Sequence, residues 1–193
     1  MTLFEYLAIA YALVLSLAAV RLLNGLSHAM SAARRYWVHA SWLWLMLFSV
    51  LLLFWQHWST HDLEWTFLTF AMNLAGPGIL YFLACTIVPD EAKGIDSWRD
   101  HYFAARRQFF GGLCAWALLM VLNTTLLLGV PLVHRSRLIP LGLMLVGVSG
   151  LTTDRPAVHA AIPMAVLAIA IFAVAILLQP GSLALSTASP GPM

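Results

Sequence analysis

The stretch LFEYLAIAYALVLSLAAVRLLNGLSHA, residues 3–29, decides the class of this protein. It is longer than the roughly 20 mostly apolar residues that an α-helix needs to cross a lipid bilayer. It also contains Arg21, with Asn24 and His28 further along. An arginine at the centre of a membrane helix costs about 2.5–3.5 kcal/mol. We therefore expect Arg21 to lie near a membrane surface, to face other helices, or to serve a function.

The rest of the chain has the same apolar character. Of its 193 residues, 62% are hydrophobic and 9% are charged. Soluble domains carry about 25% charged residues, so lipid must be the main solvent of this chain. The net charge of +2 is small and gives no sign of a nucleic-acid-binding surface. Cys85 and Cys114 fall within apolar segments and are expected to be reduced.

Six apolar segments can be drawn along the chain. They cover residues 3–29, 37–58, 64–88, 103–130, 138–152 and 157–178. The fifth segment is short and rich in glycine, so it could be tilted, broken or re-entrant. We predict an all-α bundle of about six transmembrane helices, forming one domain over residues 1–179. We also predict a short interfacial helix within residues 91–107 and a flexible tail over residues 180–193.

The distribution of Lys and Arg predicts the orientation. Most of these side chains lie in or beside the connections after segments one, three and five: Arg21, Arg34, Arg35, Lys93, Arg99, Arg106, Arg107 and Arg155. Arg135 and Arg137 lie on the opposite side. Cytoplasmic connections carry the excess of positive charge. We therefore predict an integral protein of the bacterial inner membrane with both termini outside the cytoplasm.

The first candidate site lies on the predicted cytoplasmic side. Arg21, Asn24 and His28 share one helical face, and His39 and His159 fall at a similar depth. We expect Arg21 to point into the bundle and to bind helix carbonyls or a carboxylate. The possible carboxylates are Asp96, Asp100 and Asp154. The cluster is either a hydrogen-bond network that locks the bundle or a site for a ligand or for proton transfer.

The second candidate site lies in the middle of segment three. Thr66, Thr69, Asn73 and Gly76 form a polar stripe at helical spacing, and Pro77 removes a backbone donor and weakens the helix. Segment four adds Asn123, Thr124 and Thr125. Broken helices with freed carbonyls can line the path of an ion or solute. The alternative is a kinked helix whose polar groups bond to a neighbouring helix.

Two weaker patterns suggest metal chemistry. His57 and His61 have i, i+4 spacing and are followed by Asp62 and Glu64, a set that suits a transition metal; a polar turn is the alternative. Several histidines near one depth also suggest haem b with two imidazole ligands. The candidates for that ligation are His28, His39 and His159.

A third pattern is Gly147-Val148-Ser149-Gly150, which precedes His159. It is similar to the G-x-S-G pattern of rhomboid-like intramembrane serine proteases, and the similarity covers four residues. That family pairs such a serine with a histidine on a later membrane helix. The resemblance implies Ser149 as the nucleophile and His159 as its base.

Two function classes stay open at this point. The first is a small channel or transporter for an ion or small solute. It would work as a homo-oligomer, because a chain of this length offers little room for a path within one protomer. The alternative is a non-catalytic subunit or assembly factor of a larger membrane complex, bound through its helix faces. An enzyme ranks behind both.

Overall fold

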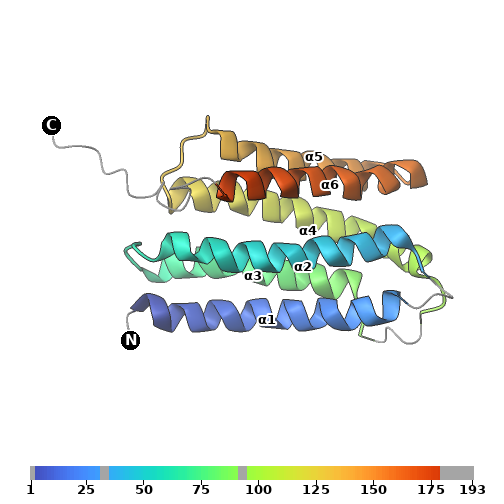
Figure 1. Ribbon diagram of the computed structural model, residues 1–193, viewed down its shortest axis with the longest axis horizontal. Coiled ribbons are helices and arrows are strands. Elements are labelled where there is room, and N and C mark those ends of the chain that lie inside the picture. The colour runs from blue at the N-terminus through green and yellow to red at the C-terminus, as the bar shows by residue number, and fades with distance from the viewer. Residues whose placement is uncertain (1–2, 31–34, 91–94, 179–193) are drawn as a thin grey trace.

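The computed structural model describes residues 3–30, 35–90 and 95–178, which form helices and no strands (Figure 1). The helices are α1 (Leu3–Ala29), α2 (Trp37–His57), η2 (Trp58–Thr60), α3 (Phe67–Ile87), α4 (Trp98–Leu126), η4 (Arg135–Arg137), α5 (Leu138–Thr152) and α6 (Pro156–Leu177). The predicted all-α class is confirmed. The predicted tail over residues 180–193 lies outside the described residues.

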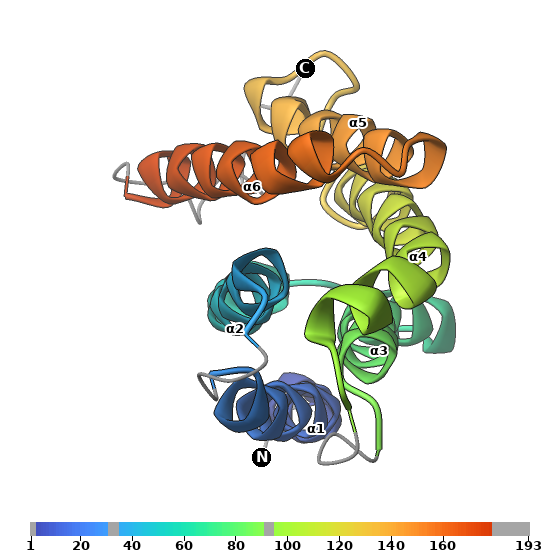
Figure 2. The ribbon, with the colours of Figure 1, turned by 90° about the vertical axis from the view of Figure 1, so that its right-hand side faces the viewer.

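The helices run up and down as one antiparallel bundle, with the start of α1 and the end of α6 at the same end (Figure 1). Viewed along the bundle, α1 packs on α2 and α3, α4 packs on α3 and α5, and α6 packs on α5 and α2 (Figure 2). Around this arrangement the spatial order of the helices is therefore α1, α3, α4, α5, α6 and α2, which differs from their order along the chain. We call the end where α2 stops the His57 end, and the opposite end, where α6 starts, the His159 end.

Among the described residues, five helices are long and apolar enough to cross a membrane, as expected of an integral membrane protein: α1, α2 with η2, α3, α4 and α6. The fifth helix, α5, has 15 residues. At 1.5 Å per residue it covers about 22 Å, which is less than the hydrocarbon thickness of about 30 Å. The predicted count of about six spans is therefore not confirmed by helix length.

The predicted interfacial helix is not confirmed as a separate element. Residues 91–94 lie outside the described part of the chain, and residues 98–107 are the first turns of α4. Trp98 and Tyr102 face the core from these turns and are buried. Helix α4 therefore begins about five residues before the apolar segment that the sequence indicated, because its first turns are amphipathic.

Helix α3 also differs from its prediction. Thr66 is its N-cap and forms a reciprocal capping box with Thr69, so these two threonines satisfy backbone groups at the helix start. The helix continues through Pro77 without interruption. Only the later part of the predicted polar stripe, at Asn73 and Gly76, lies deep enough to face the interior of the bundle.

Glycines of α5 explain how this short helix packs against α4. A Cβ atom on Gly150 would lie 2.5 Å from the ring of Phe110, and one on Gly147 would lie 2.4 Å from Sγ of Cys114. Both glycines are buried. They allow the two backbones to approach closely, which is the usual role of small residues between membrane helices.

Candidate functional site

Arg21 reaches from α1 to the residues that follow α3. Its Nε donates to the carbonyl oxygen of Val88 at 3.0 Å, and its Nη2 lies 2.6 Å from Oδ1 of Asp90. The arginine side chain is 23% exposed and that of Asp90 is 92% exposed. Arg21 therefore has a carbonyl and a carboxylate as partners. The carboxylate is not one of those named from the sequence: Asp96, Asp100 and Asp154.

Gly25 explains why these partners are within reach. It lies one turn after Arg21, and a Cβ atom there would be 2.3 Å from Cγ2 of Val88. The absence of a side chain lets the end of α3 pack directly on the backbone of α1. The close approach places the Val88 carbonyl beside the guanidinium group.

Asn24 and His28 do not join a common site with the other histidines. Asn24 lies on the surface of the bundle, and Nδ1 of His28 donates to the backbone oxygen of Asn24 at 2.7 Å. This bond is local to the last turns of α1. The predicted five-residue cluster is therefore divided among separate places.

His159 is the centre of a polar network at the His159 end. It is fully buried, with Nε2 2.9 Å from the carbonyl oxygen of Thr153 and Nδ1 2.9 Å from the hydroxyl of Tyr102. A carbonyl oxygen can only accept, so Nε2 carries a hydrogen. In the neutral ring Nδ1 then accepts the hydroxyl hydrogen of Tyr102. The contacts at both nitrogens hold the ring in one orientation.

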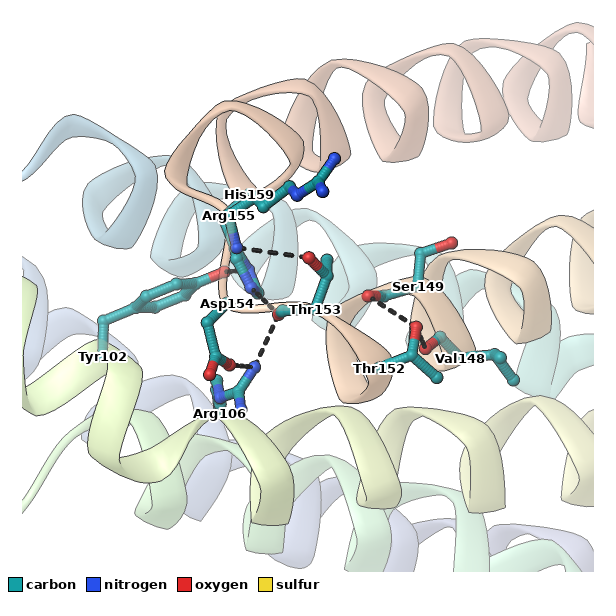
Figure 3. A network of polar contacts seen from close by, with 9 residues as sticks. All are labelled: Tyr102, Arg106, Val148, Ser149, Thr152, Thr153, Asp154, Arg155 and His159. Carbon is teal, nitrogen blue, oxygen red and sulfur yellow. Dashed lines mark hydrogen bonds and ion pairs between the residues drawn. The ribbon is translucent and has the colours of Figure 1, made fainter.

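Arg106 completes this network, which Figure 3 shows between α4 and the turn from α5 to α6. Its Nη1 donates to the same Thr153 carbonyl at 2.5 Å and forms an ion pair with Asp154. Tyr102 and Arg106 are one helical turn apart on α4. Together they fasten the α5–α6 turn to α4, and of the five residues predicted as one cluster only His159 takes part in this network.

The serine protease pattern does not assemble. Ser149 lies on the surface of the bundle and donates to the backbone oxygen of Leu145 at 2.7 Å. His159 has both of its nitrogens occupied by Tyr102 and Thr153, and no contact joins it to Ser149 in Figure 3. The glycines of the pattern are explained by packing on α4. The arrangement therefore lacks the nucleophile–base contact that acyl transfer requires.

His39 is also buried at the His159 end, away from the network. Its ring stacks on Trp98 with a centroid distance of 4.5 Å and meets the ring of His101 edge-on at 6.1 Å. Neither ring nitrogen has a hydrogen-bond partner among the described residues. Nε2 of His101 donates to the carbonyl oxygen of Ile87 at 3.2 Å. His39 is thus an aromatic packing element of this end, and its haem ligation stays a prediction.

The predicted metal ligands are divided at the His57 end. His57 is buried, with its ring stacked between Phe4 at 5.1 Å and Tyr11 at 4.0 Å. His61 lies in the turn, where Nε2 is 2.9 Å from Oδ2 of Asp62. Within residues 3–30, 35–90 and 95–178, no three His, Cys, Asp or Glu side chains converge as metal ligands. The metal hypothesis for His57, His61, Asp62 and Glu64 stays a prediction.

The His57 cavity is the feature that unites residues from several predicted sites. It has a volume of about 140 Å³. Its polar lining comes from Tyr11, Gln56, His57, Ser59, Thr60, Asn73, Asn123 and Thr124. These side chains belong to α1, α2, η2, α3 and α4. One water molecule needs about 10–15 Å³, so the cavity has room for several waters or for a small solute.

Two polar groups of the cavity lining lack partners. Asn123 donates through Nδ2 to the carbonyl oxygen of Met72 at 3.0 Å, while its Oδ1 is buried without a partner in the described structure. Asn73 lies close to His57, but neither nitrogen of that ring has a partner at hydrogen-bond geometry. Pro77 has no N–H to donate to the Asn73 carbonyl four residues earlier. Asn123 Oδ1 and the ring nitrogens of His57 are therefore buried polar atoms of this cavity without partners in the described structure.

Arg137 borders the cavity. From the sequence, this residue indicated only the orientation of the chain in the membrane. It is 5% exposed. All five N–H groups of its guanidinium donate, and the acceptors are the carbonyls of Val121, Val130 and Pro131 and the hydroxyls of Thr124 and Thr125. A cation close to the last carbonyls of a helix is stabilised by them. The Thr124-Thr125 pair at the end of α4 is the sequence feature that could have indicated this site.

A second cavity lies beside the first. It has a volume of about 80 Å³ and an almost entirely apolar lining. The two cavities share Leu53, Gln56, Trp116 and Met120. Toward the His159 end, the rings of Trp42 and Phe109 pack against each other with a centroid distance of 4.8 Å. Polar space at the His57 end is thus followed by apolar space and then by packed aromatic rings.

Comparisons with known proteins add no family to this description. No protein-family model matches the chain, and searches of curated proteins and of solved structures also find no match.

Proposed function

We propose that this protein is a small channel or transporter and that its solute binds in the His57 cavity. The observation that carries this proposal is a half-open polar cavity in an apolar bundle, and its lining contains Asn123 Oδ1 and both nitrogens of His57 without partners at hydrogen-bond geometry. A buried polar atom without a partner costs about 1–3 kcal/mol. A bound solute, or water that the solute displaces, would satisfy these atoms.

The shape of the interior supports a gated path. A polar cavity at the His57 end is followed by apolar space and by the packed rings of Trp42 and Phe109. Hydrophobic constrictions close membrane paths by excluding water. We propose that this state is closed toward the His159 end and that passage requires α2 to move relative to α4.

We further propose that α5 is a sixth crossing, so that both termini lie on one side of the membrane. The end of α6 and the start of α1 already lie at the same end of the bundle (Figure 1). Both termini outside the cytoplasm of a bacterial inner membrane is the orientation that the positive charges favour. The His57 cavity would then lie in the outer half of the bilayer.

Flux into liposomes tests the proposed function. Purified protein is reconstituted, and the entry of four probes is followed: glycerol, urea, K⁺ and Cl⁻. We expect at least one probe to enter faster than into empty liposomes, and Asn123→Leu to abolish the difference because the variant fills the cavity with apolar atoms. The matched control is Gln108→Leu, which makes the same change on the surface of the same helix. Equal rates for wild type, Asn123→Leu and empty liposomes would refute the proposal.

Native mass spectrometry tests the remaining alternatives. The cavity is lined by residues of one protomer, so a site no longer requires a homo-oligomer, and that state stays a prediction. If the spectrum shows a different protein bound at a fixed stoichiometry, the alternative of a non-catalytic subunit or assembly factor would be favoured. The same sample reports haem b or a bound metal through its mass.

A further inference from the structure

The chemistry of the His57 cavity restricts the kind of solute that it can hold. Four hydroxyl groups line the cavity, and each donates its hydrogen to a backbone carbonyl. The bonds run from Tyr11 to Leu53, from Ser59 to Gln56, from Thr60 to His57 and from Thr124 to Met120. The amide nitrogen of Asn123 donates one of its two hydrogens to Met72. The hydroxyl groups therefore offer oxygen lone pairs, while the amides of Gln56, Asn73 and Asn123 and the His57 ring can supply hydrogens to a solute.

The charge around the cavity disfavours cations. No Asp, Glu, Lys or Arg is among the described residues that line it. A buried positive charge lies beside it, because Nη1 of Arg137 donates to the hydroxyl of Thr124 in the cavity wall. A cation in the cavity would be repelled by a buried positive charge at short range.

Anions are disfavoured for a different reason. Arg137 provides positive charge, but each of its five N–H groups already donates to a protein oxygen. An anion would have to give up the hydrogen bonds of its hydration shell for a cavity whose described lining contains no Lys or Arg, and burial of an unpaired charge is costly. The field of Arg137 alone does not replace those bonds.

We propose that the solute of the His57 cavity is a small uncharged molecule that donates and accepts hydrogen bonds, of the polyol or amide type. This inference rests on the proposed function and specifies its substrate class. The solute would donate to Asn123 Oδ1 and to His57 and would leave Arg137 with its protein partners. The cavity volume of about 140 Å³ is large enough for a molecule of the size of urea or glycerol.

The test compares probes in the same proteoliposomes. Glycerol and urea entry are measured by stopped-flow light scattering, and K⁺ and Cl⁻ entry by ion-sensitive dyes trapped in the lumen. We expect glycerol or urea to enter at least about tenfold faster than K⁺, because of the charge of Arg137, and than Cl⁻, because of the cost of removing its hydration shell. Asn123→Leu should remove this entry, whereas Gln108→Leu should retain it.

A second variant keeps the proposal testable if Asn123→Leu fails to fold. Asn123→Asp conserves the size of the side chain and adds a negative charge near Arg137. We expect it to raise the K⁺ rate relative to glycerol by at least about tenfold. An unchanged ratio in a folded Asn123→Asp protein would overturn the inference.

The outcomes separate the substrate class from the function itself. Entry of K⁺ or Cl⁻ that exceeds entry of glycerol and urea, and that depends on Asn123, would overturn the substrate class and keep the channel or transporter. Absence of Asn123-dependent entry for all four probes, with folded protein confirmed by its melting curve, would overturn both.

Discussion

At the residue scale, the molecule places its buried charges beside backbone carbonyls. Arg21 binds the Val88 carbonyl after α3, Arg106 binds the Thr153 carbonyl after α5, and Arg137 binds the Pro131 carbonyl after α4. Carbonyls at helix ends lack intrahelical donors. A guanidinium satisfies several of them at once. These arginines stabilise helix ends where the chain leaves the bundle.

The pairing of Arg21 leads to a prediction about stability. Asp90 is largely exposed, so Asp90→Asn should change the free energy of unfolding by no more than about 1 kcal/mol. Arg21→Ala also leaves the Val88 carbonyl without its partner and should destabilise by about 1–3 kcal/mol. Thermal melts in detergent measure both variants, with Arg107→Ala on the surface of α4 as the control. A loss for Asp90→Asn as large as that for Arg21→Ala would contradict this assignment.

The residues of the His57 cavity show what the sequence could predict and what it could not. Asn73 and Asn123 were expected near a path because polar residues inside apolar helices are rare. His57 was grouped instead with His61, because the two are close in sequence. The rotation of α2 turns His57 inward while His61 lies in the turn beyond the helix. The rotation of α2 about its own axis depends on packing against α1 and α3. The spacing of residues along the chain could therefore not predict that His57 faces inward.

At the element scale, the glycines of α5 set its distance from α4. Gly150→Ala should destabilise by about 1–3 kcal/mol, because its Cβ would overlap the ring of Phe110. Gly111→Ala on α4 meets no atom within 4 Å and should stabilise by up to about 1 kcal/mol through helix propensity. Thermal melts compare the two alanine variants. Equal destabilisation by both would show that helix packing at Gly150 is not the cause.

The network around His159 gives a second prediction at this scale. Tyr102→Phe removes the hydroxyl that bonds to His159 and should destabilise by about 1–3 kcal/mol, because a buried ring nitrogen loses its partner. Ser149→Ala should leave both stability and flux unchanged, because its hydroxyl bonds only within α5. Melting curves and liposome flux provide the measurements. A Ser149→Ala variant that loses flux would restore a functional role for that serine.

Element boundaries were predicted well for α1 and α5. The range 3–29 for α1 and the range 138–152 for α5 match the structure. Helix α4 was predicted to start at residue 103 but begins at Trp98, because an amphipathic first turn resembles an interfacial helix in sequence. The partner of Arg21 could not be predicted, since it depends on how closely Gly25 lets α3 approach α1.

At the scale of the whole molecule, the antiparallel order of the helices predicts the topology. A reporter enzyme fused after residue 193 should be active outside the cytoplasm, and one inserted at residues 91–94 should be active in the cytoplasm. The reason is that the start of α1 and the end of α6 share one end of the bundle (Figure 1). A cytoplasmic signal from the C-terminal fusion would refute the sixth crossing by α5 or the orientation.

The central claim is that the His57 cavity is a solvated binding space inside the bundle, and cysteine labelling tests it most directly. Gly76 lines the cavity, and a Cβ atom there meets no atom within 4 Å. In a protein whose Cys85 and Cys114 are replaced by alanine, Gly76→Cys should react with a small water-soluble thiol reagent. Leu80→Cys, one turn further along α3 and fully buried, should not react. Labelling of Gly76→Cys that is as slow as that of Leu80→Cys would contradict the account.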